Sequence, residues 1–314
     1  MDPRINERAL DQRLAALEAA HRWSPRVISK LEAHIRSADE AALFRINPLR
    51  FAAEKGLAET EAIDLFLHAS ARGLFGMDWL LLCPLCSCAV ESFRSLQGVH
   101  NRYHCPMCQA DYEAMLDDYV AVTFTISPAV RQIALHRPDE LPVEEYCFLY
   151  KWTAEGLLPD GTPLVDRLRD ATRALRFLPP GAVTRLEVEA EPGLLIGWDV
   201  ESDAGFVLTV EGAPHPRSQT MPVRYSQEAC EPAGGTVAPG RVAFEVENVT
   251  TRRGLLGVAL APADGLAHGP LRFAPFLSGK RLLTTQTFRD LFRSEVIQAS
   301  KQGHRGEGHR AGVH

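Results

Sequence analysis

The sequence Cys83-Pro84-Leu85-Cys86 is followed, after eighteen residues, by Cys105-Pro106-Met107-Cys108. Two C-x-x-C pairs at this spacing are typical of a zinc ribbon, because two intervening residues let both sulfurs of a pair reach one tetrahedral ion. Four thiolates fill the coordination sphere of zinc and leave no position for a catalytic water. We therefore predict an inserted zinc ribbon at residues 79–116, with a structural Zn²⁺ bound by Cys83, Cys86, Cys105 and Cys108. The alternative is a set of four buried thiols or a redox pair.

Two neighbouring residues compete as ligands. Cys88 follows the first pair and His104 precedes the second, but neither fits the two-residue spacing, so we expect both to be bystanders. Five of the seven cysteines fall within residues 83–108, while Cys147 and Cys230 stand alone. An odd, clustered set of cysteines is a poor disulfide framework.

Composition limits the class of protein. The chain has 314 residues, 46% of them hydrophobic, with 40 acidic and 34 basic side chains and a formal charge of −6. The length predicts about two compact units with room for a small third. The acidic excess argues against a general nucleic-acid binder. Because the sequence has neither a run of about eighteen apolar residues nor a signal peptide at its start, we expect a cytoplasmic protein with no membrane segment.

Residues 1–78 are predicted to form a helical unit with a helix-turn-helix outline. Asn47 and Pro48 are typical of a helix start, Gly56 is typical of its end, and a longer helix is expected at 59–72. One interpretation of this outline is DNA recognition by the second helix. However, that helix carries three carboxylates and one arginine, whereas a recognition helix needs basic or amide side chains near phosphate. We therefore favour a packing role.

The rest of the chain completes a predicted α+β fold. A mixed β/α connecting region is expected at 117–178, with a strand at 118–126 and a charged helix at 165–175. Alternating apolar residues separated by turn signals predict an antiparallel β-sandwich at 179–278.

The C-terminal segment 279–300 is predicted to be a signalling or linker helix, with its helical part at 284–299. Its apolar stripe is formed by Phe288, Leu291, Phe292 and Val296. The tail 301–314 is rich in glycine and histidine and is expected to be disordered.

Catalytic motifs are missing from the sequence. It has no phosphate-binding loop, no dinucleotide-binding fingerprint, no H-E-x-x-H and no G-x-S-x-G. The histidines are scattered, and none pairs with a nearby nucleophile. We therefore expect no catalytic residues and no cofactor other than zinc, and we predict that the chain is not an enzyme.

Three stretches together resemble a known family. They are residues 43–74, the ribbon stretch from Trp79 to Cys108, and the segment Thr287-Phe288-Arg289-Asp290-Leu291-Phe292-Arg293-Ser294-Glu295-Val296. The chain resembles, over most of residues 10–297, the uncharacterised N-terminal region that precedes the catalytic domain in bacterial class III adenylate/guanylate cyclases. In that family the third stretch leads into the cyclase domain. Only eighteen residues follow Val296 here, so the resemblance implies a regulatory region without its catalytic domain.

The preferred hypothesis is a non-catalytic regulatory or sensory module. Its expected partners are a cyclase catalytic domain, in cis or in trans, and a second copy of the chain that would form a homodimer through residues 284–299. The alternative is a zinc-ribbon/helix-turn-helix transcription regulator, which would need Arg72, Arg94 or Arg102 at the phosphate backbone.

Overall fold

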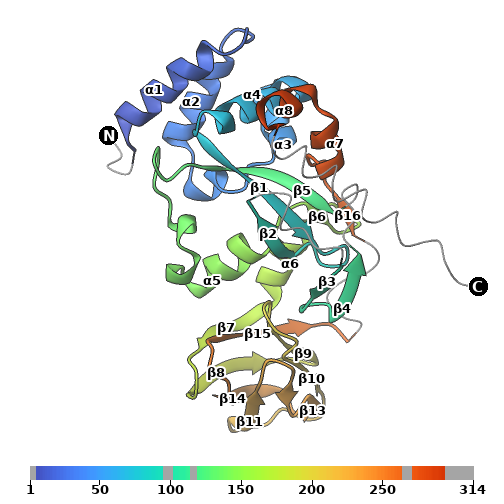
Figure 1. The fold of residues 1–314 in the computed structure, drawn as a ribbon. Coiled ribbons are helices and arrows are strands. Elements are labelled where there is room, and N and C mark those ends of the chain that lie inside the picture. Colours follow the sequence, from blue (N-terminus) through green and yellow to red (C-terminus); the bar gives the residue numbers. More distant parts are fainter. Residues whose placement is uncertain (1–4, 95–101, 114–118, 264–270, 294–314) are drawn as a thin grey trace, which may run out of the picture.

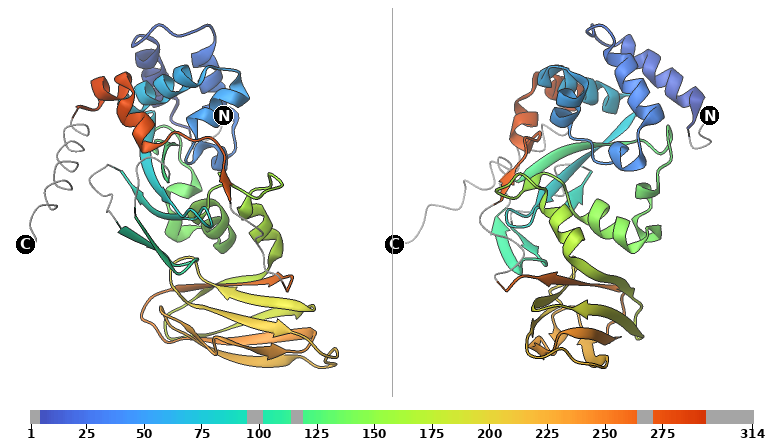
Figure 2. Two further views of the ribbon diagram at one scale, coloured as in Figure 1. Left: turned by 90° about the vertical axis from the view of Figure 1, so that its right-hand side faces the viewer. Right: turned by 180° about the vertical axis from the view of Figure 1, so that it is seen from behind.

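The computed structural model describes residues 5–94, 102–113, 119–263 and 271–293. Helices gather at one end of the molecule, a small sheet and a hairpin lie in the middle, and a β-sandwich forms the other end (Figures 1 and 2). The predicted α+β class with several antiparallel sheets is confirmed. Within the described residues, no helix has the length and apolar character needed to cross a membrane.

Five short helices form the N-terminal end. Leucines at helical spacing bury one face of the first, as expected for an amphipathic helix. The elements are α1 (Glu7–Glu18), α2 (Val27–Ser37), η1 (Glu40–Leu43), α3 (Pro48–Lys55) and α4 (Glu59–Ala71).

The capping signals of α3 are realised as predicted. The Asn47 side chain accepts a hydrogen bond from the backbone N–H of Leu49, and Gly56 ends the helix at a left-handed φ of 60°. In the following helix α4, six of the ten residues from 61 to 70 are buried and the other four are partly exposed. It packs against α1, α3, β1 and α8, so neighbouring elements cover most of its surface.

A three-stranded antiparallel sheet underlies these helices. Its order is β2-β1-β5, with β1 at Phe75–Leu82, β2 at Ala89–Phe93 and β5 at Val120–Ile126. Every residue of β5 is buried, which agrees with the strand predicted from its β-branched and aromatic residues. Trp79 of β1 lies opposite Val122 of β5 and is fully buried.

The connecting region crosses from this sheet to the sandwich. Its elements are η3 (Ala134–His136), η4 (Pro138–Glu140), α5 (Val143–Glu145), η5 (Tyr146–Lys151), β6 (Gly156–Leu157) and α6 (Leu164–Ala171). The helix predicted at 165–175 is therefore too long. Residues Thr172–Leu178 form strand β7, because their backbone pairs with β15 of the sandwich and this tertiary pairing overrides the local helical pattern.

The sandwich consists of a five-stranded sheet, β13-β10-β9-β15-β7, and a four-stranded sheet, β12-β11-β14-β8. Apolar side chains from both sheets share a core that includes Leu186, Phe206 and Phe244. The prediction of a purely antiparallel sandwich is wrong in two places, since β10–β13 and β11–β14 are parallel pairs. The strands are β8 (Val183–Ala190), β9 (Gly193–Trp198), β10 (Gly205–Val210), β11 (Gln219–Tyr225), β12 (Cys230–Glu231), β13 (Gly234–Val237), β14 (Gly240–Asn248) and β15 (Gly254–Ala261).

After the sandwich the chain returns to the helical end (Figure 1). Strand β16 (Arg272–Phe273) pairs with β6, and the backbone N–H of Val122 donates to the carbonyl of Leu277 at 2.7 Å. Helices α7 (Gly279–Thr284) and α8 (Gln286–Leu291) follow.

The terminal helix differs from the one predicted at 284–299. Thr285 separates α7 from α8, so the helix starts two residues later than predicted, and the helical path is interrupted again at Phe292. Phe288 is fully buried, and its ring faces Trp79 with the centroids 6.3 Å apart. The described part of the apolar stripe thus packs on β1 and the helical unit, and not on the sandwich. Val296 and the tail 301–314 lie outside the described residues.

Candidate metal centre

Each cysteine pair lies at the tip of a β-hairpin. The first pair follows β1 and precedes β2; there the backbone N–H of Cys83 donates to the carbonyl of Cys88, and that of Ser87 donates to the carbonyl of Cys83, both at 2.9 Å. The second pair joins β3 (Arg102–Cys105) to β4 (Ala110–Glu113). A hairpin turn directs both sulfurs of a C-x-x-C pair to the same side, as a metal knuckle requires.

The two turns share an unusual backbone conformation. Ser87 and Gln109 each follow the second cysteine of a pair, and their φ angles are 56° and 49°. Left-handed residues other than glycine are uncommon and are kept where the surrounding structure requires them. The repeated conformation indicates that both turns have the same local geometry.

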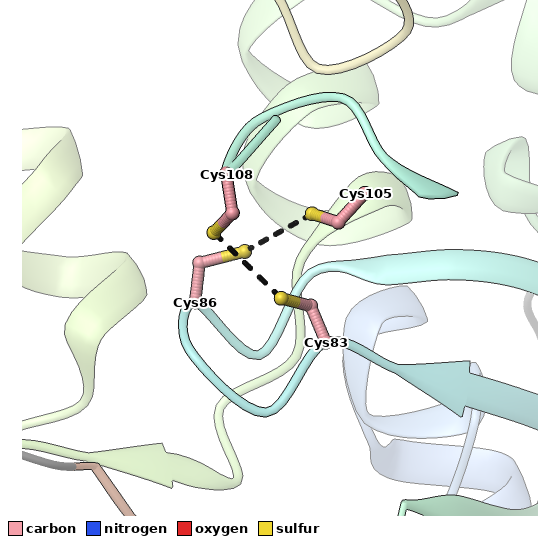
Figure 3. A group of neighbouring side chains, drawn as sticks. All are labelled: Cys83, Cys86, Cys105 and Cys108. Carbon is pink, nitrogen blue, oxygen red and sulfur yellow. Dashed lines mark hydrogen bonds between the residues drawn. The ribbon is translucent and has the colours of Figure 1, made fainter. Parts of the chain in front are cut away.

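The four cysteines come together as one cluster (Figure 3). All four sulfurs lie within 4.8 Å of one another, and the Cys83–Cys108 and Cys86–Cys105 Sγ–Sγ distances are both 3.7 Å. A tetrahedron with metal–sulfur bonds of about 2.3 Å has edges of about 3.8 Å. A disulfide would need about 2.05 Å, so these are free thiols spaced to hold one metal ion.

The electrostatics of the cluster also favour a cation. Hydrogen bonding with Cys105 lowers the pKa of Cys83 and raises the pKa of Cys86. Thiolates this close repel one another, so without a metal the four sulfurs share protons instead of all ionising. A bound cation would remove this conflict by stabilising every thiolate.

The two competing residues point elsewhere. The Cys88 thiol donates to the carbonyl of Lys151 at 3.2 Å. His104 places its ring nitrogens 2.8 Å from Asp203 and 2.9 Å from Asp111, and these carboxylates raise its pKa. Neither residue belongs to the cluster, although the sequence alone could not rule them out.

The two isolated cysteines are not ligands either. Cys147 and Cys230 are both buried, and burial raises the pKa of Cys147. Burial likewise raises the pKa of Cys230 to about 12. Both therefore act as small apolar core residues at neutral pH.

Residues far away in the sequence support the first turn. The Trp152 indole N–H donates to the carbonyl of Cys86 at 2.8 Å, and the Thr153 hydroxyl donates to the carbonyl of Ser87 at 3.1 Å. Such contacts hold ligand backbones in place around a metal site. No sequence signal marked these residues, because they lie about sixty-six positions from their partners.

The second turn faces the sandwich. The side-chain amide of Gln109 donates to the carbonyl of Asp203 at 2.8 Å, and His104 contacts the carboxylate of the same residue. Asp203 lies in the loop between β9 and β10. The cluster therefore lies between the central sheet and the sandwich, in contact with both through its two turns.

Comparison with known proteins places the chain in a family. A family model matches residues 9–290, which include all four cysteines, both sheets of the sandwich and most of α8. The chain belongs to the Family of unknown function (DUF5939). No curated protein and no solved structure matches the chain. Since the DUF5939 description names no activity, function has to be argued from the site itself.

Proposed function

We propose that the chain is a non-catalytic regulatory module that carries one structural zinc ion. The donor set supports this metal, because four thiolates in a tetrahedral arrangement are typical of zinc. Three of the four cysteines are buried, and four protein ligands leave no open position for water or substrate. A structural zinc of this kind contributes about 10–16 kcal/mol of apparent folding free energy.

Strand β1 is the observation that carries the regulatory proposal. It runs directly into Cys83 at its C-terminal end, and in its middle Trp79 packs against Phe288 of α8. Both rings are fully buried, so the strand cannot shift without moving either the metal turn or α8. This contact supports a route by which the metal centre and sheet influence the helix near the C-terminus.

The resemblance to class III cyclase N-terminal regions suggests what that helix controls. In those proteins the catalytic domain follows the corresponding segment, so the proposed partner is a cyclase catalytic domain in cis or in trans. The proposed homodimer would use residues after Leu291, because Phe288 is already covered by Trp79. A cytoplasmic location would keep the four thiolates reduced and available to zinc.

A chimeric cyclase tests the regulatory role. The full chain would be joined through its C-terminus to a class III adenylate cyclase catalytic domain, and cyclic AMP formation would be compared with that of the catalytic domain alone. We expect the rate to change severalfold and Phe288→Ala to remove the difference. Val183→Ala, at a side chain that is 66% exposed, is the control. Equal rates with and without the module would refute the proposal.

Metal analysis tests the zinc assignment separately. Purified protein should contain about one zinc ion per chain, and Cys83→Ser should lose both the zinc and the fold around it. Cys88→Ser is the matched control, because its sulfur contacts the carbonyl of Lys151 and not the cluster. Folded protein without metal, or equal loss of zinc in the two variants, would argue against this site.

The transcription-regulator alternative makes a different prediction. It requires a helix face with basic or amide side chains that can enter the major groove, but the partly exposed residues of α4 between 61 and 70 include the carboxylates of Glu61 and Asp64. Arg72 is held by the carbonyls of Ala16 and His68. We therefore expect no retention of duplex DNA in a low-salt gel shift. Retention that is weakened by Arg72→Ala would favour the alternative.

A further inference from the structure

A cavity of about 320 Å³ lies on the face of the central sheet opposite Trp79. Leu80, Leu82 and Ala121 form its floor, and Phe148, Trp152 and Phe276 contribute to its walls. This volume falls at the lower end of the range for small-molecule sites, which are mostly apolar with a few polar groups. Its polar groups therefore indicate what it would bind.

Arg45 is the first of these groups. Its backbone is left-handed, with a φ of 49°, and its half-buried guanidinium lies 4.8 Å from the ring centre of Phe44 and 4.9 Å from that of Tyr150. One guanidinium nitrogen donates to the carbonyl of Tyr150 at 2.5 Å. Within the part of the chain that the structure describes, no carboxylate lies within 4.0 Å of this cation. Burial lowers the pKa of Arg45, yet a guanidinium stays charged at any physiological pH.

The other charges around the cavity are already paired. Arg50 contacts Glu155 at 3.3 Å, and Arg169 contacts Asp166 at 2.9 Å. These two pairs leave Arg45 as the lining cation without an ion pair of its own, although the carboxylates of Asp78 and Glu155 attract it from beyond 4.0 Å. A desolvated cation without a directly paired anion is costly, so the cavity has one positive charge with which a ligand could form an ion pair.

Thr123 is an independent indication. It lines the same cavity and is only 4% exposed, and its hydroxyl has no hydrogen-bond partner among the described residues. An unpaired buried hydroxyl is unfavourable, and such groups in native proteins call for an explanation. A ligand that accepts a hydrogen bond would satisfy it.

We propose that this cavity, the Arg45 pocket, binds a small carboxylic acid with an apolar body. Arg45 would pair with the carboxylate, Thr123 would donate a hydrogen bond to it, and the apolar body would contact the aromatic walls. A monoanion fits better than a phosphate dianion, because only one cation of the lining lacks an ion pair. This inference rests on the proposed regulatory function and names the class of signal that the module senses.

The position of the pocket links it to both parts of that function. On one side, Trp152 and Thr153 line the cavity and donate hydrogen bonds to the carbonyls of Cys86 and Ser87 in the metal turn. On the other side, Phe276 lines the cavity and leads through Leu277 into α7. A ligand would thus contact the support of the metal centre and the segment that leads to the C-terminal helices.

Isothermal titration of the zinc-loaded full chain tests the proposal. The probes are phenylacetate, indole-3-acetate and 4-methylpentanoate, with phenylacetamide and inorganic phosphate for comparison. We expect saturable binding of at least one carboxylate, at least tenfold weaker binding of the amide, and no binding of phosphate. No carboxylate binding up to about 10 mM, or equal binding of acid and amide, would overturn the proposal. Tighter binding of phosphate would overturn the assigned ligand class.

Two variants assign the contacts. Arg45→Met and Thr123→Val should each weaken carboxylate binding about tenfold or more, since hydrogen bonds to charged groups are worth about that. Thr123→Val keeps the shape and should not lower stability, because it removes an unpaired buried hydroxyl. Arg185→Met, on the sandwich, is the control. Unchanged binding in both folded variants would refute the pocket, whereas the chimeric cyclase experiment would still test regulation independently.

Discussion

Replacing Phe288 with alanine tests whether α8 is an integral part of the core. In the structure this phenylalanine is fully buried between Trp79 and Phe292, although it lies near the C-terminal end of the described residues. If α8 instead served mainly as a seam between two chains, the same residue would contribute little to the stability of one chain.

The magnitude follows from burial. Removing a fully buried phenylalanine side chain loses about 1.5–3 kcal/mol of transfer free energy, and the cavity left behind raises the total to about 3–5 kcal/mol. Phe292 stacks on Phe288 with the centroids 5.3 Å apart, but it is only half-buried. Phe292→Ala should therefore cost about half as much or less.

Urea denaturation followed by circular dichroism measures both values at two protein concentrations. We expect Phe288→Ala to lower the free energy of unfolding by about 3–5 kcal/mol, independently of concentration, with light scattering reporting the oligomeric state. A loss below about 1 kcal/mol, or a loss that grows on dilution, would refute the packing described for α8.

Two further predictions concern the metal turn and pH. Trp152→Phe removes the indole N–H that donates to the carbonyl of Cys86, and it should weaken zinc binding about 10–100-fold in a chelator competition. Trp23→Phe is the control, because it removes a similar hydrogen bond to the carbonyl of Leu17 far from the metal and should leave zinc affinity unchanged. Equal effects of the two substitutions on zinc affinity would argue against a supporting role for Trp152. Burial lowers the pKa of His34 below its ordinary value of 6.5, so stability from its neutral form is present above pH 6.5 and is lost as pH falls through the folded-state pKa. Urea denaturation between pH 7.5 and pH 5 measures how the free energy of unfolding falls with pH. This fall should be less steep in His34→Gln than in the unsubstituted protein, by at most about 1.4 kcal/mol per pH unit. An identical slope in the two proteins would contradict the lowered pKa of His34.

Short sequence motifs predicted helices and turns correctly where the conformation they favour is also the one that the tertiary contacts require. Asn47 and Gly56 bound α3 as expected, because capping depends on residues within one helical turn. The spacing of Cys83 and Cys86 likewise predicted a turn that points both sulfurs one way, since two residues between thiolates fix that geometry locally.

Predictions failed where distant partners decide the conformation. Residues 172–175 were predicted to end a helix, yet they form the first part of β7 because β15 offers backbone hydrogen bonds. The helix predicted at 284–299 is interrupted at Phe292, because α8 ends at Leu291. The parallel pairs β10–β13 and β11–β14 were not predicted either. Alternation of apolar and polar residues shows that a strand has one buried and one exposed face, but it does not show whether the neighbouring strand runs parallel or antiparallel.

By itself, the sequence determined which four cysteines make up the candidate metal centre and the mixed α+β class, because residue spacing and hydrophobic period are local properties. Only the tertiary structure decided what surrounds them. It placed the Trp152 indole against the metal turn, Phe288 on Trp79, and both Arg45 and Thr123 in the lining of one cavity. The residues in each of these sets lie far apart in the sequence, and only the packing of the folded chain brings them together.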